Sequence, residues 1–242
     1  IAKGQQPATI AGKLNAVRRF YAMAQARGLS DGNPAQGLRA PADRTDRSER
    51  VKWLPLAAID RLLKAPAPTT AGGKRDRAIL AMMAIHGLRV VEVARLDVGS
   101  LDLEGKTARL QGKGNKERTV YLVGRSVAAL RAWLELRPHF AAEGEPALFV
   151  SLHHPDPGTR IDRRNLRRLV DGYLQDLGLK RPGVSCHALR HSFATLARAS
   201  GAKLDAIGKS MGHSSIAVTQ IYADIVDAQA ENPAAFLVGA LG

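Results

Sequence analysis

The chain has 242 residues, with 36 Lys and Arg against 22 Asp and Glu, which gives a formal net charge of +14 and a pI near 10.5. Its 45% hydrophobic and 24% charged residues are typical of a folded globular protein and argue against a disordered chain. A basic balance of this size favours a polyanionic partner, most often nucleic acid, over a charge that serves solubility alone.

Cysteine usage and hydropathy narrow the classes of protein further. Cys186 is the single cysteine, so no intramolecular disulfide can form, a Cys-rich zinc site is excluded and a reducing compartment is expected. No apolar run reaches the ~18 residues that span a bilayer, and no signal peptide opens the chain, so we expect no membrane partner. Because the chain begins with Ile1, we expect a piece of a longer protein.

The first part of the chain predicts one amphipathic helix. From Thr9, a candidate N-cap, apolar residues follow at helical spacing up to Ala26, and Gly28 then ends the helix. One helix cannot bury a core, so residues 1–40 are expected to be the end of a small helical domain. Residues 41–51 are charged and poor in apolar residues, which predicts a linker.

Residues 52–242 predict a larger domain that is mainly α-helical with a small antiparallel β-sheet. Two strands, Thr107–Gln111 and Arg118–Leu122, flank a Gly- and Asn-rich tip and predict a hairpin, and Leu148–Val150 predicts a further short strand. The periodicity predicts a loop over 67–73 and helices over 54–63, 74–86, 125–137, 160–177, 187–200, 203–211 and 215–227.

Motifs for metals and nucleotides are weak. His187 and His191 share a helix face at i, i+4, but Ala188 stands where a metalloprotease helix has Glu, and no third ligand is evident. The Gly- and Lys-containing segments 72–74 and 112–114 lack the spacing of a phosphate-binding loop. Strands do not alternate with helices as in a dinucleotide-binding fold. We therefore expect no metal, nucleotide or other cofactor.

Four separated segments carry cations that precede one tyrosine. Arg89 follows a Gly-Leu turn with an acidic residue three positions on, and a Lys lies 24 residues later in the hairpin tip. A His-x-x-Arg pair and a Gly-His pair follow, and the tyrosine stands nine residues after the last of these. In chain order these residues are Arg89, Glu92, Lys113, His187, Arg190, His213 and Tyr222.

This set resembles the tyrosine recombinase (phage integrase) family, and in particular its Xer-like site-specific recombinases. The resemblance covers about residues 8–228. It implies the catalytic-domain fold of that family over residues 52–242, preceded by a remnant of the family's helical core-binding domain. It also implies a recombinase or integrase that cleaves and rejoins DNA through a 3′-phosphotyrosine intermediate without metal or ATP.

The chemistry that the resemblance implies needs a nucleophile, charge stabilisation and a proton donor. Tyr222 would attack phosphorus, and Arg89 and Arg190 would hold the non-bridging oxygens, because a guanidinium fork suits two-point phosphate contact. Lys113 would protonate the leaving 5′-oxygen, with Lys116 as the alternative or as a simple phosphate contact.

The resemblance also gives the remaining site residues their expected roles. His187 would assist proton transfer from the tyrosine, His213 would hydrogen-bond the scissile phosphate, and Glu92 would orient its neighbours. No role is carried over to His191, where we expect a structural histidine.

Two further features concern binding and assembly. Four arginines at i, i+4 spacing predict DNA contacts, with an ordinary solvated face as the alternative: Arg163, Arg164, Arg167 and Arg168. The apolar segment Ala234–Leu241 resembles the tail by which family members dock onto a neighbouring protomer. This implies a homo-tetramer on double-stranded DNA, and the alternative is that the tail covers its own core.

Two other functions stay open at this point. One is a type IB topoisomerase-like enzyme, which shares the cations and the tyrosine but relaxes supercoils without strand exchange. The other is a non-catalytic DNA-binding relative, although a protein that only binds DNA has no need of the nucleophile. A DNA substrate leads us to expect a cytoplasmic, nucleoid-associated protein.

Overall fold

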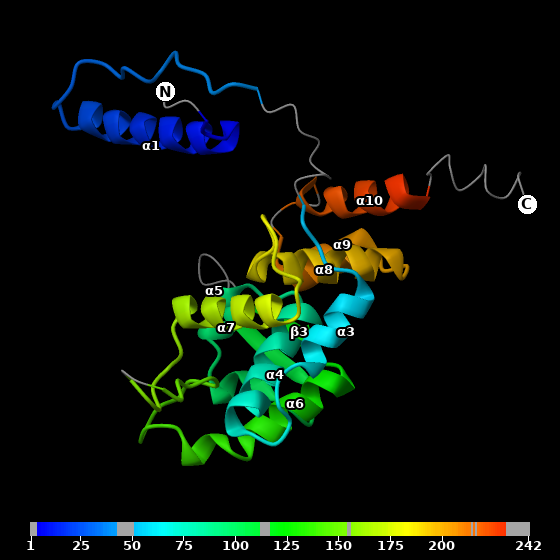
Figure 1. The fold of residues 1–242 in the computed structure, drawn as a ribbon. Coiled ribbons are helices and arrows are strands. Elements are labelled where there is room, and N and C mark those ends of the chain that lie inside the picture. Colours follow the sequence, from blue (N-terminus) through cyan, green and yellow to red (C-terminus); the bar gives the residue numbers. More distant parts are fainter. Residues whose placement is uncertain are drawn as a thin grey trace, which may run out of the picture. The chain divides into compact units, whose positions relative to one another are not determined.

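The computed structural model describes residues 4–42, 51–111, 117–153, 156–213, 215 and 217–230. The chain divides into two compact units, Ile1–Asp46 and Arg47–Gly242, which we describe separately (Figure 1). The predicted linker over 41–51 lies mostly outside the described residues. None of the helices in the described ranges has the length and apolar character that crossing a membrane requires.

The first unit is built on one long helix. This helix, α1 (Pro7–Ala26), starts before the predicted N-cap Thr9. Gln6 is the N-cap instead, and Pro7 lies in the first turn, where a missing N–H costs no intrahelical hydrogen bond. The predicted cap was therefore wrong, whereas the predicted C-terminal end at Ala26 is confirmed.

A segment after α1 folds back along the helix (Figure 1). It is held by Arg18, whose Nε donates a hydrogen bond to the Ala35 carbonyl at 2.9 Å. Phe20, Met23 and Leu29 are each more than half exposed. The unit therefore has little core of its own, as expected of one helix and a turn.

The second unit places its helices around α4 (Ala71–Ala84), which contacts α3 (Leu56–Lys64), α6 (Gly124–Leu134) and α8 (Cys186–Ala199). Within α4, every residue from Ala78 to Met83 is at most 2% exposed, so this helix forms the centre of the main core (Figure 1). The other helices are α5 (Val90–Ala94), α7 (Arg163–Asp176), α9 (Leu204–Met211) and α10 (Ala217–Ala230), with 3₁₀ turns η1 (Val98–Ser100) and η3 (Arg137–His139).

A three-stranded antiparallel sheet completes the unit, in the order β1 (Leu101–Asp102), β2 (Thr107–Gln111) and β3 (Glu117–Tyr121). The register pairs Thr107 with Tyr121 and Gln111 with Glu117. The predicted hairpin is confirmed, with β3 shifted by one residue, and the two-residue strand β1 was not predicted. The fold is therefore mainly helical with a small sheet.

Two predictions about local structure were wrong. Residues 71–73, predicted as a loop, form the first turn of α4, because the Thr70 side chain accepts a hydrogen bond from the Gly73 N–H at 3.0 Å and caps the helix. Residues 148–150 do not form a strand of the sheet, since Val150 makes an isolated bridge with Arg160 and the preceding Ala147 makes another with Asp97. A run of apolar residues indicates that a segment is buried but does not show that it is a strand. Here the buried segment is irregular.

A second, smaller core lies between α8, α9 and α10 and consists of Ala194, Ile207, Met211, Tyr222 and Ile225. Tyr222 is only 3% exposed within it. The ring of the predicted nucleophile is thus fixed by packing among α8, α9 and α10, and α8 also carries His187 and Arg190.

Candidate active site

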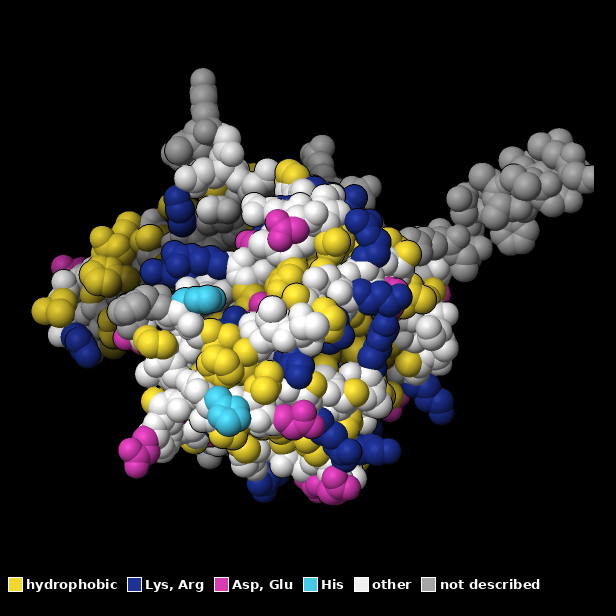
Figure 2. All heavy atoms as spheres, turned by 60° about the horizontal axis from the view of Figure 1, so that its bottom comes forward, with side chains coloured by type: hydrophobic (Ala, Val, Ile, Leu, Met, Phe, Trp, Pro, Cys, Tyr) yellow, Lys and Arg dark blue, Asp and Glu magenta, His cyan; other side chains and the backbone are white. Residues whose placement is uncertain are grey.

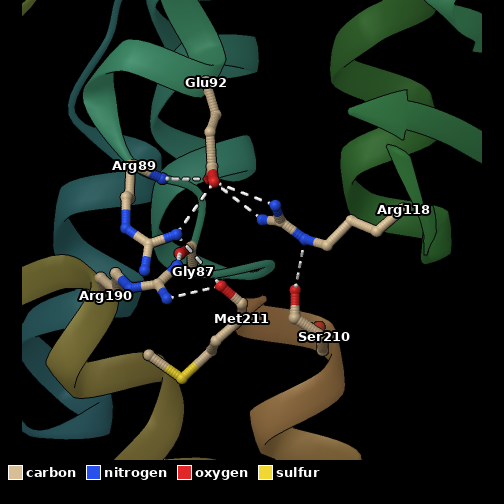
Figure 3. Close-up of polar contacts among 7 residues, drawn as sticks. All are labelled: Gly87, Arg89, Glu92, Arg118, Arg190, Ser210 and Met211. Carbon is tan, nitrogen blue, oxygen red and sulfur yellow. Dashed lines mark hydrogen bonds and ion pairs between the residues drawn. The ribbon is translucent and has the colours of Figure 1, made fainter. Parts of the chain in front are cut away.

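Three arginine side chains from different elements meet around one carboxylate (Figure 3). Arg89 is the N-cap of α5, Arg118 lies in β3 and Arg190 lies in α8. The carboxylate belongs to Glu92 in α5. We call these four residues the arginine cluster.

Glu92 binds two of the three arginines directly (Figure 3). The Arg118 Nη1 and Nη2 atoms donate to Glu92 Oε1 and Oε2 at 2.9 and 3.0 Å, a bidentate pair. The Arg89 Nη1 atom donates to Oε1 at 3.0 Å and the Arg89 backbone N–H donates to Oε2 at 2.8 Å. Burial alone would raise the pKa of Glu92, but these hydrogen bonds outweigh it and hold the pKa below its usual value. The carboxylate therefore stays ionised at neutral pH.

The carboxyl end of α9 supplies further acceptors. Arg190 Nη2 donates to the Met211 carbonyl at 2.6 Å, and Arg89 Nη1 donates to the same oxygen at 3.2 Å. Arg190 Nη1 also donates to the Gly87 carbonyl at 2.6 Å. The last carbonyls of a helix carry partial negative charge, so guanidinium groups are stabilised there. In this way α9 holds two arginines side by side.

Glycine at two positions permits this close packing. Gly212, the C-cap of α9, has φ +64°, and a Cβ atom there would lie 3.0 Å from Arg118 Nη1, whose side chain also donates from Nε to the Ser210 carbonyl at 3.1 Å. Gly87 has φ +63°, and a Cβ atom there would lie 2.5 Å from the Phe193 ring. The glycines of the Gly-Leu and Gly-His pairs are therefore required by backbone conformation and space.

The arginine cluster holds an excess of positive charge, because three guanidinium groups face one carboxylate. Burial, followed by the charge of Arg89, lowers the pKa of Arg190 to about 10, which leaves the group charged at neutral pH. The Arg89 side chain is 35% exposed and the Arg118 side chain 15%. A guanidinium carries five N–H groups, so it can hold a carbonyl and a phosphate oxygen together. The cluster is suited to binding a phosphodiester.

The predicted nucleophile lies beside the arginine cluster. Tyr222 in α10 has its Oη 2.9 Å from Nδ1 of His191, and the two ring centroids are 5.9 Å apart. We call these two residues the tyrosine pair. Burial raises the pKa of Tyr222, and the charges of Arg190 and Arg89 offset this in part, so the phenol is protonated at neutral pH. Because His191 directly follows Arg190 in α8, the pair adjoins the cluster.

The two histidines predicted to act in the site lie around the tyrosine pair. His213 follows α9, is half-buried and has its Nδ1 2.8 Å from Oγ1 of Thr219 in α10. Burial, and then the charges of the arginine cluster, lower the pKa of His213 to about 4. His187 is exposed in the first turn of α8, and its ring lies 6.3 Å from the His191 ring in an edge-to-face arrangement.

Two predicted site residues lie outside the described residues, and two residues that contact the site were not predicted. Lys113 and Lys116 lie outside the described residues, so their roles stay predictions. Arg118 was missed, although it shares the inward face of β3 with the buried Val120, and a cation at such a position needs a buried partner. The contact of His191 with the tyrosine was also missed. Among the described residues, no group of three or more His, Cys, Asp or Glu side chains is arranged to hold a metal ion.

The four arginines predicted to contact DNA are all exposed along α7. The helix begins at Asp162, whose side chain accepts hydrogen bonds from the N–H groups of Arg164 and Asn165. On the face drawn in Figure 2, Lys and Arg side chains form several groups between apolar side chains, with fewer Asp and Glu side chains. Contact of α7 with DNA stays a prediction.

Comparisons with known proteins show the family of the chain. Residues 52–229 match the Phage integrase family. The chain is 36% identical over 222 residues to the tyrosine recombinase XerC of Vibrio vulnificus (strain YJ016), covering 91% of this chain and 67% of that protein. It is 37% identical over 221 residues to the XerC of Herpetosiphon aurantiacus, covering 90% and 69%.

Solved structures show the same fold. The crystal structure of XerA recombinase superposes with a TM-score of 0.62 at 27% identity, covering 86% of this chain and 68% of that chain. The XerH site-specific recombinase, in a post-cleavage complex with palindromic difH substrate, gives a TM-score of 0.69 at 20% identity, covering 96% and 72%.

Proposed function

The chain belongs to the phage integrase family and is a tyrosine recombinase, a DNA strand-transferring enzyme, and we propose that Tyr222 is its nucleophile and the arginine cluster its phosphate site. The observation that supports this assignment is the meeting of Arg89 and Arg190 at the Met211 carbonyl, directly beside the partner of the tyrosine hydroxyl. Cations and a phenolic oxygen from four separated segments thereby lie in one region of the second unit.

In the proposed cleavage step, the Tyr222 oxygen forms a bond to phosphorus and the bond from phosphorus to the 5′-oxygen breaks. The phenolic proton leaves the tyrosine with His187 as the proposed acceptor, and the 5′-oxygen gains a proton, for which we propose Lys113 as donor and Lys116 as the alternative. The DNA 3′ end then remains on the tyrosine. Because this link replaces one phosphodiester bond by another, a 5′-hydroxyl can attack it and rejoin the strand without ATP or metal.

The arginines act on the charge that develops during this step. We propose that Arg89 and Arg190 donate to the two non-bridging oxygens, where negative charge grows as the tyrosine attacks. Glu92 orients Arg89 through its two hydrogen bonds. His213 is assigned to the phosphate and His187 to assisting proton transfer from the tyrosine.

The direct test compares two tyrosines whose hydroxyls are both hydrogen-bonded. The full chain is incubated with fragmented genomic DNA, and the DNA that becomes covalently bound is sequenced to find the cleavage site. A nicked duplex that contains this DNA site then serves as the substrate. Tyr222→Phe is expected to abolish the covalent band on a denaturing gel and to leave DNA binding intact. Tyr173→Phe, which removes a hydroxyl 3.0 Å from Asp76 Oδ2, is the matched control and keeps the band. A covalent band that persists in Tyr222→Phe would refute the assignment.

The same experiment separates the alternatives. The relatives reported above are recombinases, which favours strand exchange over a topoisomerase-like activity. A non-catalytic DNA-binding relative would give no covalent band with the unaltered chain. We infer a double-stranded DNA substrate and, from that substrate, a cytoplasmic, nucleoid-associated location.

Assembly is the last part of the proposal. We propose a homo-tetramer on paired DNA sites, in which the apolar tail Ala234–Leu241 of one protomer docks onto the next. The tail lies outside the described residues. The second unit offers a largely apolar groove between α3, α4 and α8, with Leu56 and Val123 at least half exposed. Deletion of residues 232–242 is expected to impair assembly on DNA more than binding to a single site, and assembly that survives the deletion would contradict the tail exchange.

A further inference from the structure

We propose that His191 is the positioning residue of the nucleophile, and that its Nδ1 holds the Tyr222 hydroxyl and sets the direction in which the phenolic oxygen faces the phosphate site. This inference rests on the proposed function, because it takes Tyr222 as the nucleophile. The motif residues of the sequence do not include His191, and the assignment comes from its 2.9 Å contact with the tyrosine oxygen.

The contact is specific in the described part of the chain. Among the hydrogen bonds of the described residues, Tyr222 Oη takes part in one, with Nδ1 of His191. His187, the motif histidine of the same helix, is exposed and faces the His191 ring edge to face. The Nδ1 atom of His213 is bonded to Thr219. The imidazole that touches the phenol is therefore that of His191.

The position of His191 in α8 couples the two halves of the site. Arg190 precedes it and donates to the carbonyls of Gly87 and Met211, whereas His191 faces α10. Consecutive side chains of a helix point about 100° apart, so one rigid turn sets the distance between an arginine of the phosphate site and the nucleophile. A histidine at this place fixes the phenolic oxygen relative to the arginine cluster.

The charges around His191 favour a neutral imidazole that forms a hydrogen bond over a protonated one. The titratable and charged groups around the ring are His187 and Arg190 on α8, Tyr222 on α10 and His213 after α9. Burial, followed by His187 and Arg190, lowers the pKa of His191 to about 4, so the ring is neutral at neutral pH. A neutral ring with its proton on Nε2 presents a lone pair at Nδ1 to the phenolic O–H. We therefore assign His191 to orienting the phenol group.

The test uses three variants of the full chain with the nicked duplex described above. His191→Asn places an amide near the position of Nδ1 and keeps a hydrogen bond, whereas His191→Phe fills the space without one. We expect His191→Phe to slow single-turnover covalent cleavage by about tenfold, the upper range of what one neutral hydrogen bond supplies. His191→Asn is expected to stay within about threefold of the unaltered chain, with its pH profile unchanged. If His191→Phe lowers the melting temperature, His191→Ala, which adds no bulk, takes its place.

Ser126→Ala is the matched control, since it breaks another buried hydrogen bond of a histidine to a hydroxyl, that of His86 at 2.7 Å. It is expected to lower the melting temperature and to leave cleavage unchanged. Equal cleavage by His191→Phe and the unaltered chain would overturn the inference, and so would an equal loss in His191→Phe and His191→Asn. Loss of one limb of the pH profile in His191→Asn would make His191 a proton acceptor instead. In each case Tyr222→Phe still loses the covalent band, which distinguishes failure of this inference from failure of the proposed function.

Discussion

The arginine cluster and the tyrosine pair adjoin each other but are held to different degrees. Glu92 accepts four hydrogen bonds from Arg89 and Arg118, and the last carbonyls of α9 accept three more from the cluster (Figure 3). Among the described residues, the tyrosine hydroxyl has one hydrogen bond, to His191, and the tyrosine ring is held by apolar packing.

This difference means that the arginine cluster and the tyrosine pair are positioned for the proposed reaction in two different ways. The proposed phosphate site is fixed in advance by charged hydrogen bonds, so in the proposed reaction it would stabilise developing charge without rearranging. The nucleophile side depends on packing and one neutral hydrogen bond, so a small change in α10 can move the oxygen. Changes in the cluster should therefore affect both stability and chemistry, whereas changes in the pair should affect chemistry first.

The largest effect is expected from Arg89→Ala. Loss of a donor to a developing oxyanion typically costs about a hundredfold or more in rate, and Arg89 is the more open of the arginines that Glu92 holds. Single-turnover cleavage of the nicked duplex measures it. Arg95→Ala, at the exposed C-cap of the same short helix, is the matched control and should change cleavage little. Similar rates for the two variants would remove Arg89 from the phosphate site.

Glu92→Gln tests how strongly the cluster supports the fold. It leaves Arg118 and Arg89 without their carboxylate, and breaking a buried ion pair costs on the order of 3 kcal/mol of unfolding free energy. The pKa of Glu92 is below its usual value of 4.5, so its stabilisation is present above that value and is lost as the pH falls through the folded-state pKa. Urea unfolding at pH 7 and at pH 4 should show the difference between variant and unaltered chain narrowing in acid.

Glu104→Gln is the control for this measurement, because the ion pair of Glu104 with Arg131 at 2.7 Å is exposed. Exposed pairs contribute little, so this variant should match the unaltered chain. A loss in Glu104→Gln as large as that in Glu92→Gln would mean that the buried pair has no special place in the fold.

The sequence predicts those site residues that stand in short motifs, but it does not predict the contacts that depend on how distant segments pack. Arg89, Arg190, His213 and Tyr222 stand in short motifs whose spacing is a local property of the chain. The pairing of Arg118 with Glu92 joins strand β3 to helix α5 over 26 positions, and no local sequence pattern predicts it. The contact of His191 with the tyrosine likewise depends on how α8 packs against α10.

The fold shows the same limit at smaller scale. Periodicity predicts the long helices and the strands of the hairpin, because burial repeats along them. It misses the two-residue strand β1, which is too short to show alternation. It misplaces the start of α4, because the capping by Thr70 decides that boundary.

Acid should destabilise the tyrosine pair and the core in parallel. Burial lowers the pKa values of His86 and His191 to about 4, from 6.5, so the unfolded chain binds more protons at mildly acidic pH. The free energy of unfolding should therefore fall as the pH decreases from 6.5 to 5, by at most about 1.4 kcal/mol per pH unit for the buried His86. His86→Gln should flatten the slope, whereas His139→Gln, at an exposed ring, should not. A flat profile over this range would contradict the burial of both rings.

Gly212→Ala should show how closely the cluster is packed against α9. A side chain at φ +64° costs about 1 kcal/mol, and its Cβ atom would also lie 3.0 Å from Arg118 Nη1. Gly178→Ala is the matched control, since it has φ +66° and nothing within 4 Å of the added atom. The excess loss of melting temperature in Gly212→Ala over Gly178→Ala measures the contact with Arg118. Equal losses in the two variants would mean that Arg118 moves aside freely.

The smallest effect is expected from the arginines of α7. Their substitution tests whether DNA binding can be separated from the arginine cluster and the tyrosine pair. Burial and then the charges of Arg190, Arg89 and Arg167 lower the pKa of His187, so Arg167 lies near the first turn of α8. Arg163 stands one helical turn before Arg167 in the same row of α7.

If that row contacts DNA phosphates, Arg163→Gln with Arg167→Gln should reduce the slope of log affinity against log salt by about 0.9 for each phosphate that is no longer neutralised. The other row, Arg164→Gln with Arg168→Gln, is the internal control and should change the slope less. Cleavage at saturating DNA should stay the same in both, because neither row reaches the tyrosine pair in the hydrogen bonds of the described residues. Equal slopes for all three proteins would make α7 an ordinary solvated helix and leave DNA binding to other surfaces.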